Sequence, residues 1–261
     1  MLLNSILTIL QDIAPLDLAE SWDNVGLLVG RRDSDVSCAM TCLTLTDVTL
    51  QEAIEAKANL IVTHHPIPFK PISKITDDTT SGSLLLKAAR ADIAIYSPHT
   101  AWDNCARGIN QQLAEELGLT NIKPLQQAVS PKYKDECVGT GRYGSMVATA
   151  IGDVLEKLGT ALPIEQARHT HTLSKTVSKI GIVCGSGGSM LGLVASRGCD
   201  AMLTGEATYH QCLEAEAQGI VLIMIGHHAS EAFAMKRLAG MLQESIPSIR
   251  VFASANEHSL F

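Results

Sequence analysis

Four short segments of the chain share one plan, and this repetition constrains the fold more than any other feature of the sequence. Each segment contains a helix rich in small residues, a turn with a glycine or a charged residue, an apolar strand and a polar strand end. The segments are EAIEAKANLIVTHH, LLKAARADIAIYSPHT, LVASRGCDAMLTGE and EAEAQGIVLIMIGHH. Helices that alternate with continuous apolar strands at such short intervals predict an α/β fold with mostly parallel sheets.

The stretch 126–146 differs from the rest of the chain because it is polar, rich in glycine and only weakly alternating. Such a stretch is typical of a loop that leads into strands where two lobes join. We therefore expect a single folded unit, residues 1–261, made of two similar lobes that comprise residues 1–125 and 126–261.

The composition limits where the protein works and what it binds. The seven cysteines form no Cys-x-x-Cys pair, which disfavours a disulfide framework or a thiolate zinc site and fits a reducing cytoplasm. A formal net charge of −7 disfavours binding to nucleic acids or anionic membranes. Ile6, Ile9 and Ile13 predict an amphipathic first helix, and no apolar stretch is long enough to cross a bilayer. We expect a cytoplasmic protein without a membrane partner.

Polar groups follow each of the four predicted strands. In open α/β sheets, ligands bind beyond the carboxyl ends of the strands. The groups found there can bind metal or transfer protons: His64 and His65, His99, Glu206, and His227 and His228. A lone histidine is usually structural, but four such strand ends in one chain are the main functional signal of the sequence.

His64 and His65 are adjacent at the end of the first of these strands. Neighbouring side chains on a regular strand point to opposite faces, so two adjacent imidazoles suit two neighbouring metal ions better than one. Pro66 biases His65 toward an extended conformation, which reduces the cost of ordering the site. The alternative is a pair of surface histidines in a loop.

The tripeptide Trp-Asp-Asn occurs twice, and it contains both tryptophans of the chain. The second copy, with Asp103, follows the strand end that carries His99, so it offers imidazole and carboxylate within one loop. Asp103 is therefore the better candidate ligand. We expect Asp23, in the first copy, to order a turn.

His227 and Glu231 lie four residues apart in GHHASEAF. If a helix begins here, they share one face and can bind one metal ion together. The alternative is that Ser230 and Glu231 are polar residues of a first helical turn, favoured by the helix dipole. His228 points elsewhere on such a helix and is expected at the surface.

Three histidines and two carboxylates thus converge as candidate ligands: His64, His65, Asp103, His227 and Glu231. Mixed nitrogen and oxygen ligands suit Zn, Fe, Mn or Ni without distinguishing between them. Five ligands are too many for a closed tetrahedral site, but they serve two ions if one carboxylate bridges and water fills the remaining positions. Open positions of this kind are typical of catalytic sites, where bound water has a lowered pKa.

Three further residues are candidates for proton transfer around such a site. They are His99 and, four residues apart in LTGEATYHQ, Glu206 and His210. The alternative for LTGEATYHQ is a helix start capped by Thr204 or Gly205, with Glu206 in its first turn. The glycine-rich stretch 182–191 predicts a strand, a tight turn and a helix; its backbone amides could bind an anion, but it lacks the lysine of a P-loop.

Together these motifs resemble those of the Nif-three-like proteins, also known as GTP cyclohydrolase 1 type 2 homologues. The resemblance runs through SWDNVGLLVG, IVTHHPIPF, YSPHTAWDN, GSGGS, LTGEATYH and GHHASE in that order and spans nearly the whole chain. The chain resembles the short form of this family, without the domain that some members insert between the two halves.

The resemblance implies details that the residues alone do not provide. It implies a Nif-three-like fold of two interleaved α/β lobes, a dinuclear metal site between the lobes, and a ring-shaped (toroidal) homohexamer. By similarity, His65 and Asp103 bind one of the two divalent ions. His64 and His227 bind the other, and Glu231 bridges them.

We therefore expect a dinuclear metal-dependent hydrolase that acts on a small nucleotide-like or heterocyclic substrate. The family name implies opening of the purine ring of GTP, but the sequence shows neither a well-placed cysteine ligand nor a Lys and Arg cluster for a triphosphate. The alternative is a noncatalytic metal-binding ring that acts as a scaffold, delivers metal or has a regulatory role. Exchangeable waters on the metal ions favour the enzyme, and a saturated coordination shell favours the scaffold.

Overall fold

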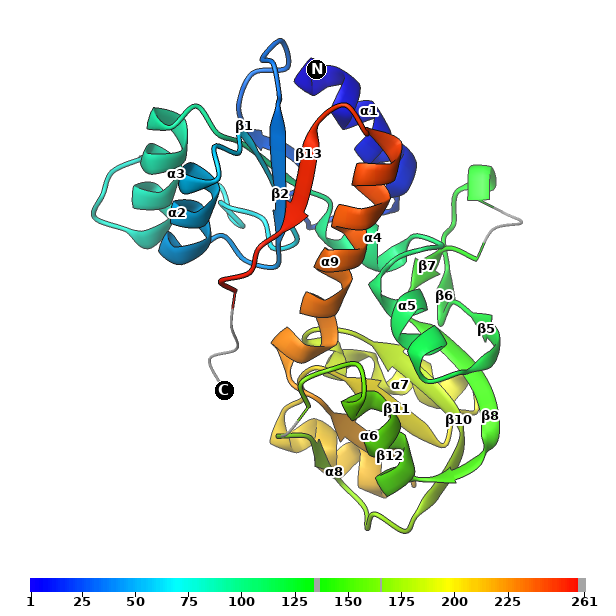
Figure 1. The fold of residues 1–261 in the computed structure, drawn as a ribbon. Helices are drawn as coiled ribbons and strands as arrows, with labels where there is room; N and C mark the ends of the chain where they lie inside the picture. Colours follow the sequence, from blue (N-terminus) through cyan, green and yellow to red (C-terminus); the bar gives the residue numbers. More distant parts are fainter. Residues whose placement is uncertain (134–136, 165, 258–261) are drawn as a thin grey trace. The chain divides into compact units, whose positions relative to one another are not determined.

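Figure 1 shows the fold of the chain as a computed structural model, which describes residues 1–133, 137–164 and 166–257. Helices and strands alternate along most of the chain, which confirms the α/β fold predicted from the four repeated segments. The stretch 126–146 contains short strands and the start of a long one, as expected of a segment that leads into strands. Its residues 134–136 lie outside the described part.

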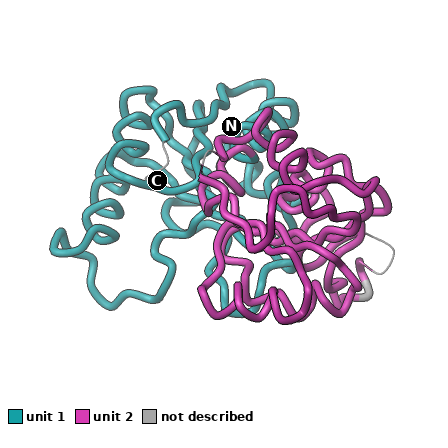
Figure 2. The backbone as a smooth tube through the Cα atoms, turned by 90° about the horizontal axis from the view of Figure 1, so that it is seen from below, with its two compact units in different colours: residues 1–102, 234–260 teal, residues 103–233, 261 magenta. Residues whose placement is uncertain are grey.

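The chain forms two compact units, shown in two colours in Figure 2: residues 1–102 with 234–260 are unit 1, and residues 103–233 are most of unit 2. The division differs from the expected boundary near residue 125. The reason is that β13 (Arg250–Ala253) pairs in parallel with β2 (Cys38–Cys42), which returns the end of the chain to the first sheet. A local sequence pattern does not contain this long-range pairing.

Unit 1 is built around a sheet of five strands in the order β1-β4-β3-β2-β13, in which all neighbours are parallel except β1 and β4. Its other elements are α1 (Leu3–Ile13), η1 (Leu16–Leu18), β1 (Gly26–Val29), α2 (Asp47–Glu55), β3 (Leu60–Thr63), α3 (Thr80–Arg90) and β4 (Ala94–Ser97). Two helices, α4 (His99–Asn104) and α9 (His227–Ser245), contain the points at which the chain passes from one unit to the other.

Both faces of this sheet are buried, which explains its continuous apolar strands. Met40, Ile61 and Ile95 point to the face that α2 and α3 cover. The opposite face carries Thr41, whose buried hydroxyl donates a 2.8 Å hydrogen bond to the Met235 carbonyl of α9.

Unit 2 is built around a mixed sheet of six strands in the order β5-β8-β10-β11-β12-β9. The central strands β10, β11 and β12 are parallel, β8 and β9 flank them antiparallel, and β5 pairs antiparallel with β8, so this sheet is mixed rather than mostly parallel as predicted. The elements are α5 (Ile109–Glu116), β5 (Thr120–Lys123), β6 (Gln126–Gln127), η2 (Pro131–Tyr133), β7 (Gly139–Thr140), β8 (Arg142–Ala150), α6 (Ile151–Gly159), β9 (Arg168–His169), β10 (Thr176–Val183), η3 (Gly187–Met190), α7 (Leu191–Ser196), β11 (Ala201–Thr204), α8 (Tyr209–Ala217) and β12 (Val221–Met224).

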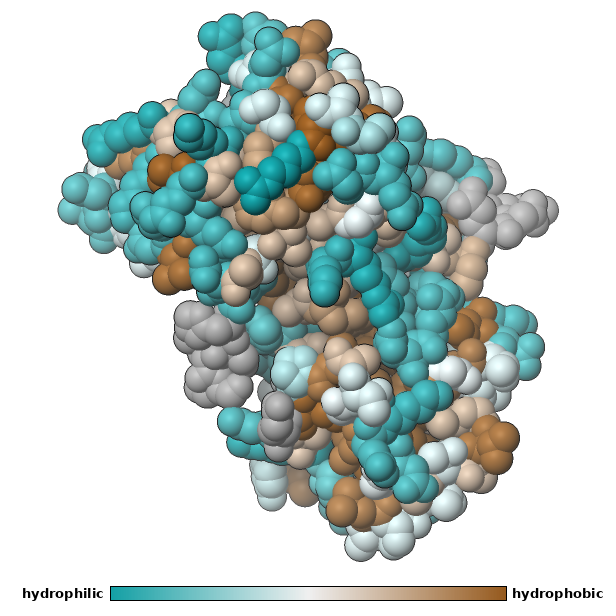
Figure 3. Space-filling view, in the orientation of Figure 1, coloured by the Kyte–Doolittle hydropathy of each residue, from teal (hydrophilic) through white to brown (hydrophobic). Residues whose placement is uncertain are grey.

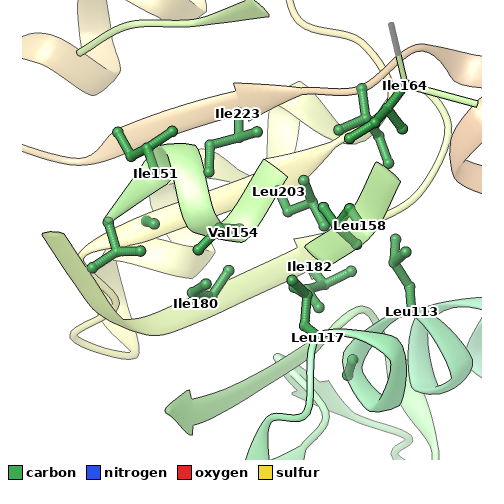
Figure 4. Packing of buried hydrophobic residues seen from close by; sticks show 14 of the residues in the cluster. Leu113, Leu117, Ile151, Val154, Leu158, Ile164, Ile180, Ile182, Leu203 and Ile223 are labelled. Carbon is green, nitrogen blue, oxygen red and sulfur yellow. The ribbon is translucent and has the colours of Figure 1, made fainter. Parts of the chain in front are cut away.

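Successive residues of the central strands of unit 2 alternate between two apolar clusters. Leu203 and Ile223 pack with α5 and α6 in the cluster that Figure 4 shows from close by. Met202 and Leu222 point the other way and pack with residues of α7 and α8. Successive residues of a strand point to opposite faces of the sheet, and both faces are buried here. The strands therefore contain continuous apolar runs, as the sequence shows.

The predicted turns between helix and strand are present in all four repeated segments. Each contains a residue with positive φ: Lys57 (57°), Asp92 (54°), Gly198 (68°) and Gly219 (69°). This backbone conformation ends a helix and turns the chain into the following strand. It explains the glycines at two of the four turns and is tolerated by Asp92, whereas Lys57 adopts it without such a preference.

The surface in Figure 3 is largely hydrophilic on the visible face, and apolar residues reach it in separate patches. Within the described residues, the chain contains no helix with the length and apolar character that a membrane span requires.

Candidate metal centre

Of the predicted ligands, His64 and His65 lie in the loop after β3, Asp103 lies in α4, and His227 and Glu231 lie in the first turns of α9. In unit 1, His64 and His65 follow β3 and His99 begins α4 after β4, beside the loop that follows β2. In unit 2, Glu206 follows β11 and His227 begins α9 after β12. Because the strands concerned are parallel within each sheet, each sheet gathers its polar strand ends at one edge.

Three imidazoles gather in unit 1. His64, His65 and His99 each offer a ring nitrogen within 4.8 Å of the others. The ring centroid of His64 lies 5.2 Å from that of His65 and 5.0 Å from that of His99. His64 is fully buried, which excludes the alternative of a pair of surface histidines.

Hydrogen bonds hold the two adjacent histidines in place. The backbone amides of His64 and His65 donate to the carbonyls of Cys42 and Leu43 at 3.0 and 2.8 Å, which continues the pairing of β3 with β2 into the site. The Ser97 hydroxyl donates to the His64 carbonyl at 2.6 Å. Nδ1 of His65 lies 2.8 Å from Oγ1 of Thr44, a contact that orients the imidazole ring.

His99 is held by Asp23, a residue that sequence reasoning assigned to a turn. Oδ1 of Asp23 does accept from the next amide, but it also lies 2.8 Å from Nδ1 of His99. Oδ2 accepts from the backbone and hydroxyl of Thr100 at 3.1 and 2.5 Å. Burial alone would raise the pKa of Asp23, but the hydrogen bonds from His99 and Thr100 outweigh it and lower that pKa to about 2. Asp23 therefore stays ionised and fixes Nδ1 of His99, which leaves Nε2 to accept a proton.

The backbone of His99 is strained, because its φ is 32°, in the left-handed region that few residues other than glycine adopt. Such conformations persist where surrounding contacts determine them, and they cluster at functional sites. Here the contacts to Asp23 from both His99 and Thr100 hold the turn.

Two exposed aromatic side chains flank His99. Trp22 is 62% exposed and Phe69 is 47% exposed, although both are large and apolar. Their ring centroids are 6.0 Å apart, and they lie 6.3 and 6.1 Å from the His99 ring in edge-on arrangements. This pair forms an accessible aromatic surface beside the imidazole cluster.

In unit 2, His227 and Glu231 lie on one face of α9, as their spacing predicts. Nε2 of His227 is 3.1 Å from Oε2 of Glu231. The hydrogen bond to Glu231 outweighs burial and raises the pKa of His227 to about 9. His228, expected at the surface, is instead half-buried.

The glycine-rich turn of unit 2 packs directly against this pair. Gly185 has a φ of 60°, and a Cβ at this position would collide with Oε1 of Glu231. The Gly185 amide donates to the Ser230 hydroxyl at 2.9 Å, and that hydroxyl donates to the His227 carbonyl at 2.8 Å. The turn therefore fixes the start of α9, rather than cradling a phosphate.

The two tentative proton-transfer residues of unit 2 occupy different surroundings. Oε2 of Glu206 lies 3.4 Å from Nδ1 of His227 and accepts from the Ser186 hydroxyl at 2.9 Å. His210 lies on the exposed first turn of α8, with its ring 5.9 Å from that of Tyr209. The cap of α8 is Thr208 and not Thr204 or Gly205, so Glu206 precedes the helix and is free of the capping role considered for it.

Asp103 has a neighbour that sequence reasoning missed. The Cys184 thiol lies 3.3 Å from Oδ1 of Asp103, and Asn110 connects the two, accepting from the Cys184 amide at 2.8 Å and donating to the Asp103 carbonyl at 3.2 Å. Burial, followed by the negative charges of Asp103 and Glu231, raises the pKa of Cys184. The thiol therefore stays protonated and orients the carboxylate as a donor. The sequence signal was its position directly after β10, another strand end.

The donors in both units fit divalent transition metals. Three imidazole nitrogens lie close together in unit 1, and unit 2 presents two carboxylates and an imidazole, a mixture that suits Zn, Fe, Mn or Ni. Nδ1 of His65 faces Thr44 and Nδ1 of His227 faces Glu206, the type of outer partner that orients metal-binding histidines.

Comparisons with known proteins identify the family of the chain. Residues 1–259 match the family Duf34/NIF3 (NGG1p interacting factor 3). The GTP cyclohydrolase 1 type 2 homolog of Clostridium perfringens is 34% identical over 98% of this chain and 97% of its own length. A Helicobacter pylori protein named GTP cyclohydrolase 1 type 2 is 31% identical over 88% of this chain and 87% of its own length.

The fold is shared as well. A Bacillus cereus protein related to NIF3 superimposes with a TM-score of 0.91 at 22% identity, covering 100% of this chain and 98% of that one. The family match and the shared fold extend over nearly the whole chain, and the resemblance inferred from the sequence is confirmed: the chain belongs to the Duf34/NIF3 family.

Proposed function

We propose that the protein is a dinuclear metal-dependent hydrolase that acts on a small nucleotide-like or heterocyclic substrate. In this proposal His65 and Asp103 would hold one divalent ion and His64 and His227 the other, with Glu231 as the fifth ligand. Family membership and the fit of the donor atoms to divalent metals support this assignment.

The His99–Asp23 pair is the observation that carries the enzymatic part of the proposal. A protein that only stores metal needs ligands but no oriented proton acceptor. Here an ionised, buried carboxylate fixes Nδ1 of His99 beside His64 and His65, in a strained backbone conformation. This arrangement is typical of general acid–base catalysis.

The residues of the chain divide the chemistry between them. Bound metal ions would supply Lewis acidity and a water molecule of lowered pKa. Nε2 of His99 accepts the proton of the attacking water and returns it to the leaving group, while Asp23 holds the ring and stabilises its charged form. Glu206 holds Nδ1 of His227 and can pass protons to solvent, as can His210 at the exposed start of α8.

The aromatic surface of Trp22 and Phe69 supports a flat, heterocyclic substrate. Aromatic faces stack on heterocyclic bases, and each such contact contributes about 1–3 kcal/mol. The name of the Helicobacter pylori relative, GTP cyclohydrolase 1 type 2, points to the same class of substrate.

Two further expectations from the family resemblance belong to this proposal: a ring-shaped homohexamer and a cytoplasmic location. Light scattering of the purified protein tests the first, with six chains per particle expected. Imaging of a tagged chain in its own cell tests the second.

The proposal is tested by replacing ligands and measuring metal content and turnover together. His64→Ala and Glu231→Ala are expected to lose metal and hydrolysis of nucleotides or cyclic amides. Glu216→Ala, at an exposed position of α8, is the matched control and is expected to keep both. Hydrolysis that survives loss of metal would overturn the mechanism. Tightly bound metal with a saturated coordination shell and no turnover would favour the noncatalytic alternative.

A further inference from the structure

The C-terminal residues that follow β13 reach the same edge of the unit 1 sheet as the three histidines. β13 is parallel to β2, so residues after its end lie beside the loop after β2. The amide of Ser254 continues this pairing by donating to the Thr41 carbonyl at 2.8 Å. The last described residue of the chain, Glu257, belongs to this segment.

The carboxylate of Glu257 binds the loop after β2 with both oxygens. Oε2 accepts from the Leu43 amide and Oε1 from the Thr44 amide, each at 2.7 Å. Two short hydrogen bonds to a charged acceptor fix the loop more firmly than neutral hydrogen bonds would. The loop lies directly before α2, where the helix dipole also favours a negative charge.

A second carboxylate holds the segment from the other side. Glu52 of α2 accepts from the Ala255 amide at 2.8 Å, from the Asn256 amide at 3.3 Å and from the Ser254 hydroxyl at 2.5 Å. The helix thus holds the tail while the tail holds the loop before the helix. The two acidic residues act as a reciprocal clamp on residues 254–257.

The loop that Glu257 binds also orients a proposed metal ligand. Thr44 donates its backbone amide to Glu257 and places its hydroxyl 2.8 Å from Nδ1 of His65. The carbonyl of Leu43 accepts from the His65 amide at 2.8 Å. Both contacts of the loop to His65 therefore come from the two residues whose amides Glu257 fixes.

We propose that Glu257 is a positioning residue for the metal centre: its carboxylate fixes the Leu43–Thr44 loop, and the Thr44 hydroxyl thereby holds the His65 ring in the orientation in which it would bind a metal ion. This assignment rests on the proposed function only in taking His65 as a ligand. The part that concerns the loop and the orientation of the ring stands independently of any bound metal.

The test compares metal affinity in a double-mutant cycle of full-length variants. Glu257→Gln keeps the size of the side chain but replaces one acceptor by a donor, and it is expected to weaken Zn²⁺ affinity about tenfold, as loss of an outer partner of a ligand does. Thr44→Val, which keeps the amide but removes the hydroxyl, is expected to have a similar effect. Because both act through one ring, the double variant should be little weaker than either single variant.

Glu244→Gln is the matched control, since Glu244 is exposed on α9 in the same unit. It is expected to leave Zn²⁺ affinity unchanged. A purely structural role of Glu257 would lower the melting temperature without changing Zn²⁺ affinity, and that result would overturn the proposal. Additive effects of Glu257→Gln and Thr44→Val would overturn it as well.

A measurement on the metal-free protein separates failure of this inference from failure of the proposed function. Nitrogen NMR of His65 is expected to show one dominant ring tautomer in the unsubstituted protein and a mixture in Glu257→Gln, with faster exchange of the Leu43 and Thr44 amides. If the unsubstituted protein binds no Zn²⁺, the proposed function fails while this result still decides the role of Glu257. An unchanged tautomer in the variant would contradict that role.

Discussion

The polar clusters of the two units hold their candidate ligands in opposite ways. In unit 1, Nδ1 of His65 lies against Thr44 and Nδ1 of His99 lies against Asp23, so residues outside the ligand set orient both rings. In unit 2 the candidate ligands His227 and Glu231 bind each other.

This difference concerns two requirements of a metal site: its ligands must be oriented, and they must be deprotonated. The unit 1 cluster is arranged in advance, so a metal ion needs little reorganisation to bind there. The unit 2 cluster holds a proton on His227 that a metal ion must displace, because a metal-binding imidazole is neutral. We therefore expect metal affinity to depend on the orientation of the imidazole rings in the unit 1 cluster and on the protonation of His227 in the unit 2 cluster.

The largest effect is expected from a substitution that removes the negative charge orienting His99. Asp23→Asn keeps the shape of the side chain but no longer enforces the tautomer, so turnover should fall by about 10²–10⁴-fold while metal content stays unchanged. Turnover is measured beside that of Asp33→Asn, whose carboxylate is exposed and paired with Arg31. Loss of metal in Asp23→Asn would show that Asp23 supports the ligands rather than the proton transfer.

The next largest effect is expected from a substitution in the glycine-rich turn that packs against Glu231 in unit 2. Gly185→Ala places a Cβ against Glu231 and forces alanine into a positive φ, at a cost of about 1–3 kcal/mol. We expect weaker metal binding and a lower free energy of unfolding. Gly192→Ala in α7 is the control, because a Cβ there has no atom within 4 Å. Equal behaviour of the two variants in a metal titration and thermal melts would contradict the packing described for Gly185.

A third prediction uses pH to distinguish the two clusters. With the pKa of His227 near 9 in the metal-free protein, metal binding at neutral pH releases this proton, so affinity should rise about tenfold per pH unit toward pH 9. Glu231→Gln removes the main cause of the raised pKa and should flatten this dependence. Calorimetry in two buffers with different protonation enthalpies counts the protons released, and no release between pH 7 and 9 would refute the prediction.

The same pKa values predict opposite pH limits for stability of the metal-free protein. The raised pKa of His227 stabilises the fold below its ordinary pKa of 6.5, and this contribution is lost as the pH rises through about 9. The lowered pKa of Asp23 stabilises the fold above its ordinary pKa of 3.8, and this contribution is lost as the pH falls toward 2. Denaturant melts of Asp23→Asn and Glu231→Gln across this range test which limit each variant removes.

The smallest expected effect concerns Cys184. Because the thiol is protonated and donates to Asp103, Cys184→Ser should keep metal affinity within a few-fold, whereas Cys184→Ala should lose about 1–2 kcal/mol of stability with the donor. The thiol should also resist alkylation at pH 8, since burial raises its pKa. Rapid alkylation of Cys184 would show instead that it is a thiolate.

The sequence was sufficient to predict the local units of the fold and the strand ends that carry the site. An apolar run followed by a histidine is a pattern of only a few adjacent residues, so the sequence alone reveals it. The structure places His64, His99 and His227 at the ends of such strands, at the edge of a sheet. The helical spacing of His227 and Glu231 is likewise local, and the two side chains do meet.

Pairings between distant residues could not be predicted in this way. Asp23 and His99 are 76 positions apart, and Glu257 and Leu43 are 214 positions apart, so no periodicity or spacing connects them. The same limit explains the boundary expected near residue 125, since the return of β13 to β2 depends on strand pairing across the whole chain. The repeated Trp-Asp-Asn was the one signal that pointed to Asp23, and only the structure shows which partner it has.

The central claim is that the two clusters bind two divalent ions through five named ligands. Anomalous X-ray diffraction from crystals of the natively purified protein, collected at the absorption edge of the metal found in it, tests this claim most directly. We expect two anomalous peaks per chain, coordinated by His64, His65, Asp103, His227 and Glu231. A single peak, or peaks bound by other residues, would contradict the account.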